Sequence, residues 1–385
     1  MPAPTGTTFT LLNRVDDAYA AMLAAIAAAT RTVRLETYIF EASPIADAFR
    51  DALTHAAQRG LEVQLLIDAW GSPDLHDDYW QNFRAAGGQF RWFNPFNLTR
   101  FGIRNHRKLL VCDEATAFIG GFNIAPEYQG DGITRGWRDL GLRLDGELAE
   151  QLGLTFRDLF DRAEFRLLSI NRLLKFIQPS VPATPDTYVA PNSEILLTGP
   201  GLRRNPFLAA LLRDLAHARE VQITSAYFLP SWRIRRALNK TARRGGRVQL
   251  LLAGKSDVRL SQLAARSLYQ GLLRAGVEIY EYQPQILHAK TVRLDGTLYV
   301  GSANLDTRSL HINYELMIRV QDPNLAATAR DNFLTDLTHS HRIDPATWPH
   351  SRGLFEKLQE RLACFLLARV DPYLARRQLR NRRES

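Results

Sequence analysis

The chain has 385 residues, of which 45% are hydrophobic and 23% charged, a composition typical of a globular protein long enough for two domains. Its formal net charge of +9 indicates an anionic partner, and charge alone does not distinguish nucleic acid from an acidic membrane surface. The two cysteines, Cys112 and Cys364, exclude a disulfide framework and form no metal-binding cluster with histidine, so a reducing compartment is the simpler expectation.

The apolar segment 18–29 is expected to be a core helix. Asp16 and Asp17 precede it and Arg31 follows it, whereas a secretory signal carries basic residues before its apolar run. The segment is also shorter than the ~20 apolar residues that a membrane-spanning helix needs. We therefore expect an alanine-rich helix that begins near Asn13 or Asp16.

Strands and helices alternate after this helix. Apolar and β-branched runs predict strands, and amphipathic runs ended by glycine predict helices. In chain order we expect a strand over 32–40, a helix over 45–59, a strand over 63–67, a helix over 79–86 and a strand over 90–93. This alternation predicts an α/β sheet with helices packed on its faces.

The second half of the chain repeats this order. Segments 221–228, 248–252 and 272–277 correspond to 32–40, 63–67 and 82–87. Similar elements at a nearly constant offset indicate a duplicated domain, and a pseudo-two-fold axis brings equivalent segments together. The predicted fold class is therefore α/β, with two tandem, pseudo-two-fold-related α/β/α sandwich domains.

Proline marks the expected boundary between the domains. Residues 179–186 are proline-rich and poor in large apolar side chains, as in a surface linker. We expect a first domain over 1–178, a linker over 179–192, a second domain over 193–345 and a basic amphipathic tail over 346–385. Just before the linker, residues 165–177 are apolar with three cations and no acid, which fits a helix at a lipid interface or a core helix between the domains.

The C-terminal tail allows two interpretations. Five apolar side chains fall on one helical face: Leu354, Leu358, Leu362, Phe365 and Leu366. Residues 376–383 add five arginines and no acid. Each basic residue near an anionic bilayer contributes roughly 1 kcal/mol, so the tail fits a membrane surface. A solvated tail without a specific role is the alternative.

One short pattern occurs twice. The first copy consists of His106, Lys108 and Asp113, followed by Gly120, Gly121 and Asn123. The second consists of His288, Lys290 and Asp295, followed by Gly301, Ser302 and Asn304. In each copy the histidine and lysine are two residues apart, so on a strand their side chains share one face. Together with the asparagine they form an anion site that also carries a nucleophile, and two such sites facing each other hold one phosphate between two imidazoles.

Both copies resemble the His-x-Lys-x4-Asp signature of the phospholipase D superfamily. The resemblance implies two phospholipase D-like domains and a catalytic set in which the aspartate is usually more structural than chemical: His106, Lys108, Asp113, His288, Lys290 and Asp295. One histidine attacks phosphorus to form a phosphohistidine, while the other protonates the leaving alcohol and then activates the acceptor. We expect His106 to be the nucleophile and His288 the acid and base, and the pseudo-symmetry leaves the reverse open.

Other polar residues are expected to assist the two histidines. Asn123 and Asn304 are expected to donate hydrogen bonds to the phosphate, as the lysines do, so that neither a metal nor another cofactor is required. Glu127, and in the second half Glu315 or Asp306, are candidates for the carboxylate that orients an attacking histidine, and we assign Glu127 and Glu315 to the substrate-binding set. Asp139 also fits the start of an ordinary strand.

The second copy departs from the signature in two ways. Five residues rather than six separate Asp295 from Gly301, which predicts a tighter turn. Ser302 stands where the first copy has Gly121, so a hydroxyl contact is expected on one side only. Neither change removes a histidine, a lysine or an asparagine.

Within the superfamily the chain looks most like the bacterial cardiolipin synthases, over about residues 33–320. The selective parts are segments 105–108, 120–128, 137–139 and 301–309, with Asn313 and Glu315. The resemblance implies a phosphatidyltransferase that moves a phosphatidyl group from phosphatidylglycerol to a second phospholipid. It implies a peripheral protein on the cytoplasmic face of the cell membrane, held by basic and amphipathic surfaces. Because one chain carries both motifs, a monomer is expected to be complete.

Three alternatives remain open from the sequence. A phospholipase D hydrolase has the same residues and takes water as acceptor. A nuclease of the superfamily also fits the positive charge, and Trp92, Phe93, Phe96 and Phe101 supply aromatic side chains near the first motif, but these equally suit lipid, and nucleic acid is not the partner we expect. A non-catalytic membrane-binding module is disfavoured by two intact sets of histidine, lysine and asparagine.

Overall fold

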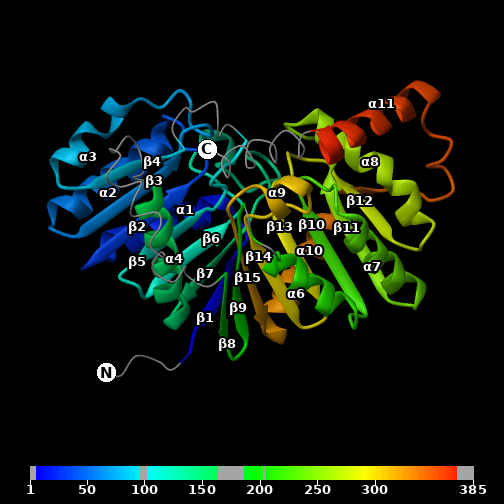
Figure 1. The fold of residues 1–385 in the computed structure, drawn as a ribbon, viewed down its shortest axis with the longest axis horizontal. Coiled ribbons are helices and arrows are strands. Elements are labelled where there is room, and N and C mark those ends of the chain that lie inside the picture. Colours follow the sequence, from blue (N-terminus) through cyan, green and yellow to red (C-terminus); the bar gives the residue numbers. More distant parts are fainter. Residues whose placement is uncertain (1–5, 95–101, 164–185, 201, 203, 371–385) are drawn as a thin grey trace, which may run out of the picture.

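The computed structural model describes residues 6–94, 102–163, 186–200, 202 and 204–370. Within these residues two α/β halves lie side by side, each built on one sheet (Figure 1). The first sheet has seven strands, in the order β1 (Thr8–Leu12), β7 (Gly141–Asp145), β6 (Thr116–Gly120), β5 (Leu109–Cys112), β2 (Thr32–Thr37), β3 (Glu62–Asp68) and β4 (Gln89–Phe93).

The described part of the second half contains a nine-stranded sheet. Its order is β16 (Ser340–Arg342), β12 (Glu278–Tyr282), β11 (Arg247–Ala253), β10 (Glu220–Ser225), β13 (Lys290–Leu294), β14 (Thr297–Gly301), β15 (Glu315–Gln321), β9 (Ser193–Thr198) and β8 (Thr187–Ala190). The series β15-β14-β13-β10-β11-β12 repeats β7-β6-β5-β2-β3-β4. In each series the last three strands are parallel and the others antiparallel. The predicted α/β fold with a duplicated domain is thus confirmed.

Helices cover the outer face of each sheet. The first sheet carries α1 (Val15–Ala28), α2 (Pro44–Gln58) and, after the 3-10 turn η1 (Asp77–Trp80), α3 (Gln81–Ala85). The second carries α6 (Pro206–Leu215), α7 (Trp232–Arg243) and α8 (Arg259–Leu273). Local sequence sets these bounds: Ser43 caps α2 before Pro44, and Gly60, at φ +85°, follows its end.

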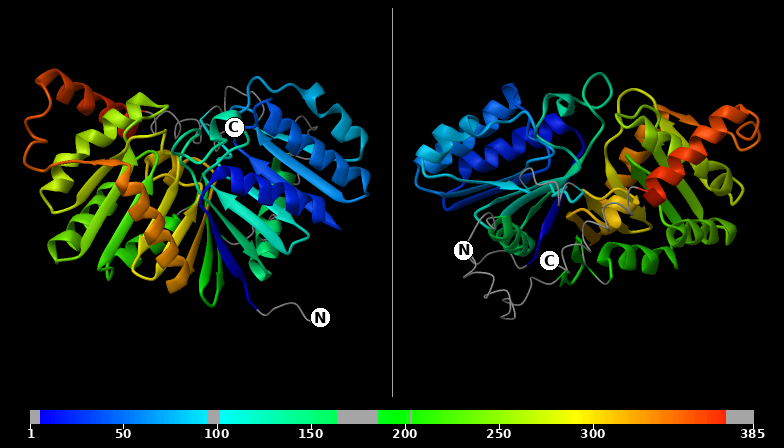
Figure 2. Two further views of the ribbon diagram at one scale, coloured as in Figure 1. Left: turned by 180° about the vertical axis from the view of Figure 1, so that it is seen from behind. Right: turned by 45° about the horizontal axis from the view of Figure 1, so that its top comes forward.

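The inner faces of the two sheets share one apolar core. It joins residues of the first half, such as Leu109 and Ile119, with residues of the second, such as Val300 and Ile318. The helices α4 (Glu147–Ala163) and α10 (Pro323–Thr338) contribute to this core. Figures 1 and 2 show the sheets converging where β1 lies beside β8 and β9. Because both halves contribute to this core, the burial of apolar surface stabilises their association as it stabilises each half.

Several short elements complete the described chain: η2 (Pro126–Tyr128), α9 (Thr307–His311), α11 (Leu354–Phe365) and a π-helical turn η4 (Leu366–Val370). The strands β1, β9 and β16 were not predicted, and β8 lies in the segment 179–192 that the sequence assigned to a linker. Thr187–Ala190 pair with β9 as an edge strand, so the second sheet begins before residue 193. None of the helices in the described ranges is long and apolar enough to cross a bilayer.

Two other expectations lie outside the described residues. They are the apolar helix over 165–177 and the arginine cluster over 376–383. Most of the proline-rich segment 179–186 also lies there. The amphipathic helix expected in the tail is present as α11.

A buried ion pair joins the two halves next to the repeated motifs. Arg138 precedes β7 in the first half, and its Nε lies 2.8 Å from Asp336 Oδ1 on α10 of the second. The Arg138 N–H donates to the Ile286 carbonyl, and the Arg138 carbonyl accepts from the N–H of His288. Both charged side chains are buried, so each depends on the other for its countercharge.

We predict that Asp336→Asn destabilises the protein by about 3–5 kcal/mol, because the isosteric amide leaves the Arg138 guanidinium buried without a countercharge. Urea unfolding followed by circular dichroism measures the change. The matched control is Asp331→Asn on the same helix, where an exposed pair with Arg330 is removed and a change below about 1 kcal/mol is expected. Equal effects of the two substitutions would contradict a stabilising link between the halves.

Candidate active site

The two motif histidines lie where the halves meet, at the carboxyl ends of the parallel strands. His106 precedes β5 and lies next to the end of β2, and His288 precedes β13 next to the end of β10. The backbone pairs each histidine with the other half, since the His106 N–H donates to the Tyr314 carbonyl as that of His288 does to Arg138. We call the edge formed by the carboxyl ends of β2, β3, β10 and β11 the site edge.

Each histidine takes its carboxylate from the other half. The Nδ1 of His106 lies 2.9 Å from Glu315 Oε2, and the Nδ1 of His288 lies 2.7 Å from Asp139 Oδ2. All four side chains are buried. An ionised carboxylate at Nδ1 favours the tautomer in which Nδ1 carries the proton, which leaves the Nε2 lone pair for chemistry. Neither Nε2 has a hydrogen-bond partner within the described residues, so both are available to a ligand.

This arrangement revises the expected carboxylates. Of the three candidates Glu127, Glu315 and Asp306, Glu315 contacts a histidine, and that histidine is His106 of the first half. Glu127 is half-buried on η2, and its carbonyl accepts from the Trp137 N–H. Within the described residues its carboxylate makes no hydrogen bond or ion pair with either histidine. Asp306 caps α9 by accepting from the Ser309 N–H. The sequence analysis did not assign Asp139 to a histidine. The signal that could have identified it is its position: Asp139 lies just before β7, in the place that corresponds to Glu315 at the start of β15.

The difference between Gly121 and Ser302 follows from these carboxylates. A Cβ at Gly121 would lie 2.5 Å from Asp139 Oδ1, so that position has no room for a side chain. In the second half the Ser302 hydroxyl donates to Glu315 Oε2 at 2.6 Å, and Asn313 Nδ2 lies 3.4 Å from Oε1. The hydroxyl contact expected on one side only is therefore present at Glu315.

The two lysines are buried beside the imidazoles. Lys108 Nζ donates to the His106 carbonyl at 2.7 Å, and Lys290 Nζ donates to the His288 carbonyl. Lys290 Nζ also lies 2.9 Å from His288 Nδ1. Because Nδ1 donates its proton to Asp139, this last contact places a positive charge next to the ring rather than adding a hydrogen bond.

The asparagines of the two motifs form hydrogen bonds with neighbouring residues of the protein. Asn123 Oδ1 accepts from the Ile39 N–H at 3.0 Å, and its Nδ2 donates to the Tyr128 hydroxyl at 2.7 Å. Asn304 Oδ1 accepts from the Tyr227 N–H at 3.3 Å. These bonds fix the loops that follow β6 and β14, so part of each amide is engaged with the protein itself.

Asp113 and Asp295 lie at the opposite end of their strands from the histidines. Asp113 follows the four residues of β5, about 16 Å from Lys108 at ~3.3 Å per residue. Its carboxylate accepts N–H groups of Thr30, Arg31 and Thr32, and that of Asp295 accepts those of Arg219 and Glu220. Both have φ near +50° in a tight turn. The geometry therefore corrects their place in the catalytic set: they tie the hairpin turns to the neighbouring strands.

Aromatic rings lie beside both imidazoles, one next to His106 and three next to His288 among the described residues. The Tyr38 ring centroid is 5.1 Å from that of His106, and Tyr128 and Trp137 lie at 5.3 and 5.4 Å from His288. The ring centroid of Tyr227, a residue of the second half, lies 6.5 Å from that of His288. Rings on these sides exclude water from the histidines and restrict their rotation.

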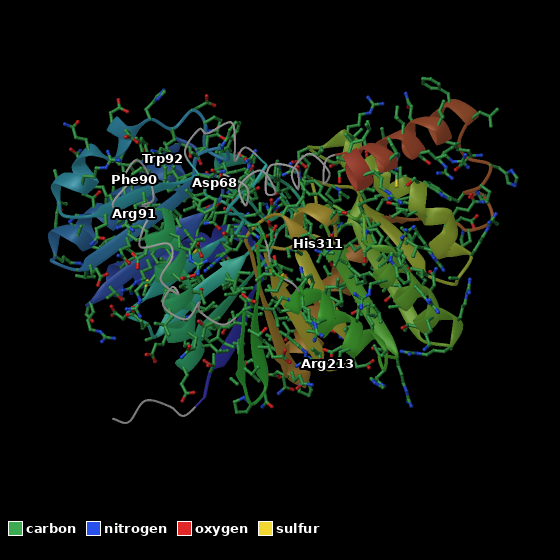
Figure 3. All side chains as sticks on the ribbon, viewed as in Figure 1. Asp68, Phe90, Arg91, Trp92, Arg213 and His311 are labelled. Carbon is green, nitrogen blue, oxygen red and sulfur yellow. The ribbon has the colours of Figure 1, made fainter. Side chains whose placement is uncertain are left out.

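The first motif has a buried support for which the second has no equivalent among the residues that the structure describes. The Arg107 guanidinium is 2.7 Å from Glu36 Oε1, and Asn105 Nδ2 donates to Glu36 Oε2. Asp68, at the end of β3 and labelled in Figure 3, accepts the Asn105 N–H at 2.7 Å. Burial raises the pKa of Asp68 to about 7, although its bond to Asn105 opposes the rise. In the second copy, Leu287 and Ala289 stand in place of Asn105 and Arg107.

Burial and like charge lower the pKa of the basic groups. Burial lowers the pKa of His288 to about 4 with help from Lys290, and it lowers that of His106 against the opposing charge of Glu315. It also lowers the pKa of Lys290 to about 8 and that of Lys108 well below its usual range. Lys290 acts on His106 and Lys108 acts on His288, so the two motifs lie within electrostatic reach of each other.

The pKa values of the two carboxylates are also lowered, but for a different reason. Burial by itself raises the pKa of Glu315 and Asp139, but the adjacent histidines and lysines hold both values below the usual range. Because burial and like charge work against the protonated forms of the basic groups, an anion that binds between the motifs favours those forms. Within the described ranges no group of three or more potential metal ligands occurs.

Comparison with known proteins points to one family. A family model for the cardiolipin synthase, phospholipase D-like domain matches the chain twice, over residues 22–130 and 211–337. A cardiolipin synthase B of Escherichia coli is 34% identical over 338 residues, which cover 85% of this chain and 79% of that protein. A cardiolipin synthase of Clostridium perfringens is 33% identical over 344 residues, which cover 86% and 71%.

The fold is also found in a solved structure. The phosphatidylserine synthase of Haemophilus influenzae matches with a TM-score of 0.73 over 95% of this chain and 94% of that one. The sequence identity is 15%, so this likeness concerns the fold.

We predict that His288 stays neutral down to about pH 4 in the free protein, whereas an unfolded chain protonates it near 6.5. Between these values the unfolded state binds more protons, so stability falls as the pH drops through this window. NMR titration of 13C-labelled histidine measures the pKa, with His288→Gln assigning the signal. Asp139→Asn is expected to lower the pKa further, and inorganic phosphate to raise it. A midpoint at or above 6.5 in the free protein would contradict the burial argument.

Proposed function

Since the chain belongs to the cardiolipin synthase family of phospholipase D-like proteins, we propose that it transfers a phosphatidyl group from phosphatidylglycerol to the hydroxyl of a second phospholipid. The observation that carries this proposal is the pair of buried histidines, each oriented by a carboxylate of the other half and flanked by a lysine. The enzyme class follows from the family, while the substrates and residue roles are our proposal.

The first step forms a covalent intermediate. The phosphodiester binds between the motifs, where Lys108 and Lys290 offset its charge. The Nε2 of His106 attacks phosphorus, the bond from phosphorus to the glycerol oxygen breaks, and His288 gives its proton to that oxygen. The ring of His106 is the more accessible of the two, with 11% of its side chain exposed against 4% for His288, which supports His106 as the nucleophile.

The second step regenerates the enzyme. The acceptor hydroxyl loses its proton to His288 and attacks phosphorus, and the bond from phosphorus to His106 breaks. Because the bound phosphodiester adds negative charge beside both rings, it raises the pKa of His288 and allows it to carry the proton that it must donate. Glu315 and Asp139 stay ionised and hold the Nδ1 protons throughout, so they act as positioning residues. One chain supplies every group, so we propose that a monomer is active.

The same chemistry runs with water in place of the acceptor lipid, which would make the protein a hydrolase. The aromatic rings around His106 and His288 favour transfer because they restrict water. We further propose that the protein works as a peripheral protein at the cytoplasmic face of the cell membrane, where its lipid substrates are.

We predict that the purified protein converts phosphatidylglycerol vesicles to cardiolipin and glycerol, and that His106→Ala and His288→Ala each lower the rate at least ~10³-fold, because each removes a group that acts on every turnover. Mass spectrometry of the lipids measures both. His350→Ala, a substitution outside the site, is the control and is expected to keep the wild-type rate. Phosphatidic acid as the sole product would instead indicate a hydrolase, and cleavage of single-stranded nucleic acid without lipid turnover would indicate a nuclease.

A further inference from the structure

We propose that the second half of the molecule docks on an anionic lipid bilayer through the exposed face of α11 and the adjoining ends of α7 and α8. This inference deepens the proposed function and rests on it for the choice of a phospholipid surface. We call these parts the docking surface, and its apolar members are Trp232, Val258, Leu260, Leu354, Phe355, Leu358, Leu362 and Phe365.

The apolar residues of α11 form a stripe that the protein leaves uncovered. Leu354, Phe355, Leu358, Leu362 and Phe365 are between 56% and 88% exposed. At ~100° per residue these five positions fall within an arc of about 100° on the helix. The opposite face is held against the protein, with Ala363 and Glu360 buried and Glu360 paired with Arg352 at 2.6 Å. A rigid helix that exposes such a stripe marks an interaction surface.

The end of α11 approaches the loop that carries Asn304. Ala363 packs with Leu229 and Ala264, and Leu367 and Ala368 pack against the same cluster. The Leu229 N–H donates to the carbonyl of Leu305, which directly follows Asn304. Figures 1 and 2 show α11 along the outer margin of the second half, with its C-terminal end directed toward the boundary between the halves.

The other apolar members lie at the site edge itself. Trp232 begins α7 soon after the end of β10, and Val258 and Leu260 lie around the start of α8, soon after the end of β11. The Tyr227 hydroxyl donates to Asp257 at 2.6 Å, next to Val258, and Tyr227 also faces His288. By contrast, the exposed Val189 lies on β8, near the opposite end of the strands.

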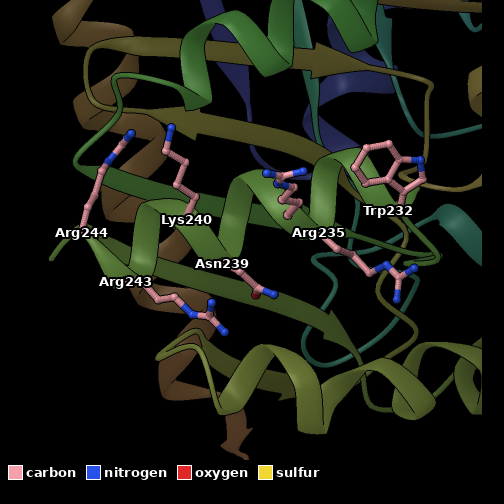
Figure 4. Close-up of a pocket in the computed structure, with 7 residues that line it drawn as sticks. Trp232, Arg235, Asn239, Lys240, Arg243 and Arg244 are labelled. Carbon is pink, nitrogen blue, oxygen red and sulfur yellow. The ribbon is translucent and has the colours of Figure 1, made fainter.

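The positive charge of α7 indicates which partner binds the docking surface. Between Ser231 and Arg247 the chain carries no aspartate or glutamate. A groove of about 600 Å³ runs along α7 from Trp232 at the site edge, and it is lined by Arg235, Arg236, Lys240, Arg243 and Arg244 (Figure 4). Arg235 and Arg236, near the start of α7, are the cations of this groove nearest to the docking surface. A second copy of the chain on this surface would bring like charges together, whereas an anionic bilayer attracts the cations and takes up the apolar side chains.

The test is sedimentation of the full chain with phosphatidylcholine vesicles that contain or lack phosphatidylglycerol. Leu358→Glu combined with Leu362→Glu is expected to weaken binding to the anionic vesicles at least about tenfold, because two charges enter the apolar stripe. Val189→Glu, an equally exposed apolar position away from the docking surface, is the matched control and is expected to bind as wild type. Circular dichroism verifies that each variant is folded.

Measurements of lipid turnover distinguish a defect in membrane docking from a defect in catalysis. The double variant is expected to lose activity on vesicles and to keep it on monomeric short-chain phosphatidylglycerol, whereas His288→Ala keeps vesicle binding and loses both activities. If the wild-type protein turns over no lipid, the proposed function fails while the binding result still tests the docking surface. Unchanged vesicle binding by the double variant would overturn the proposal, and so would a wild-type dimer that the double variant converts to a monomer.

Discussion

The site depends on the exchange of carboxylates between the two halves. Four basic side chains, His106, Lys108, His288 and Lys290, are buried together, and such a cluster is stable only with countercharges and hydrogen bonds. Glu315 and Asp139 supply these, each across the boundary between the halves. Neither half alone contains an oriented histidine, so the shared core and the Arg138–Asp336 pair are as necessary to the chemistry as the motifs.

Much of the fold was predictable because the chain repeats itself. The alternation of strands and helices, and the spacing of histidine and lysine, are local properties that a sequence displays. The strands β1, β8, β9 and β16, which lie at or next to the edges of the sheets, were missed because short strands lack a strong pattern. At the site, Asp139 was not assigned to a histidine and the partner of Glu315 was left open, because both contacts cross between the halves. A sequence shows which acidic residues are present, but it does not show that their contacts cross from one half to the other.

The two repeats have diverged in ways that suit different tasks. The loop of His106 rests on the buried Glu36, Arg107 and Asn105, and the carboxylate of its partner Glu315 also accepts from Ser302. In the described part of the chain His288 has no such support, and Lys290 Nζ lies 2.9 Å from its Nδ1. The apolar stripe of α11 and the cations of α7 belong to the second half only. A symmetric scaffold thus carries an asymmetric site and an asymmetric surface.

The central claim is that His106 carries the phosphatidyl group in a covalent intermediate. The most direct test is to react His288→Ala with phosphatidyl-p-nitrophenol, whose leaving group needs no proton, and to map the modified peptide under alkaline conditions. The account predicts a burst of about one equivalent of p-nitrophenol and a phosphatidyl group on His106, because the base for the second step is missing. No phosphatidyl group on His106 in His288→Ala, together with a phosphatidyl group on His288 in the reciprocal His106→Ala variant, would contradict it.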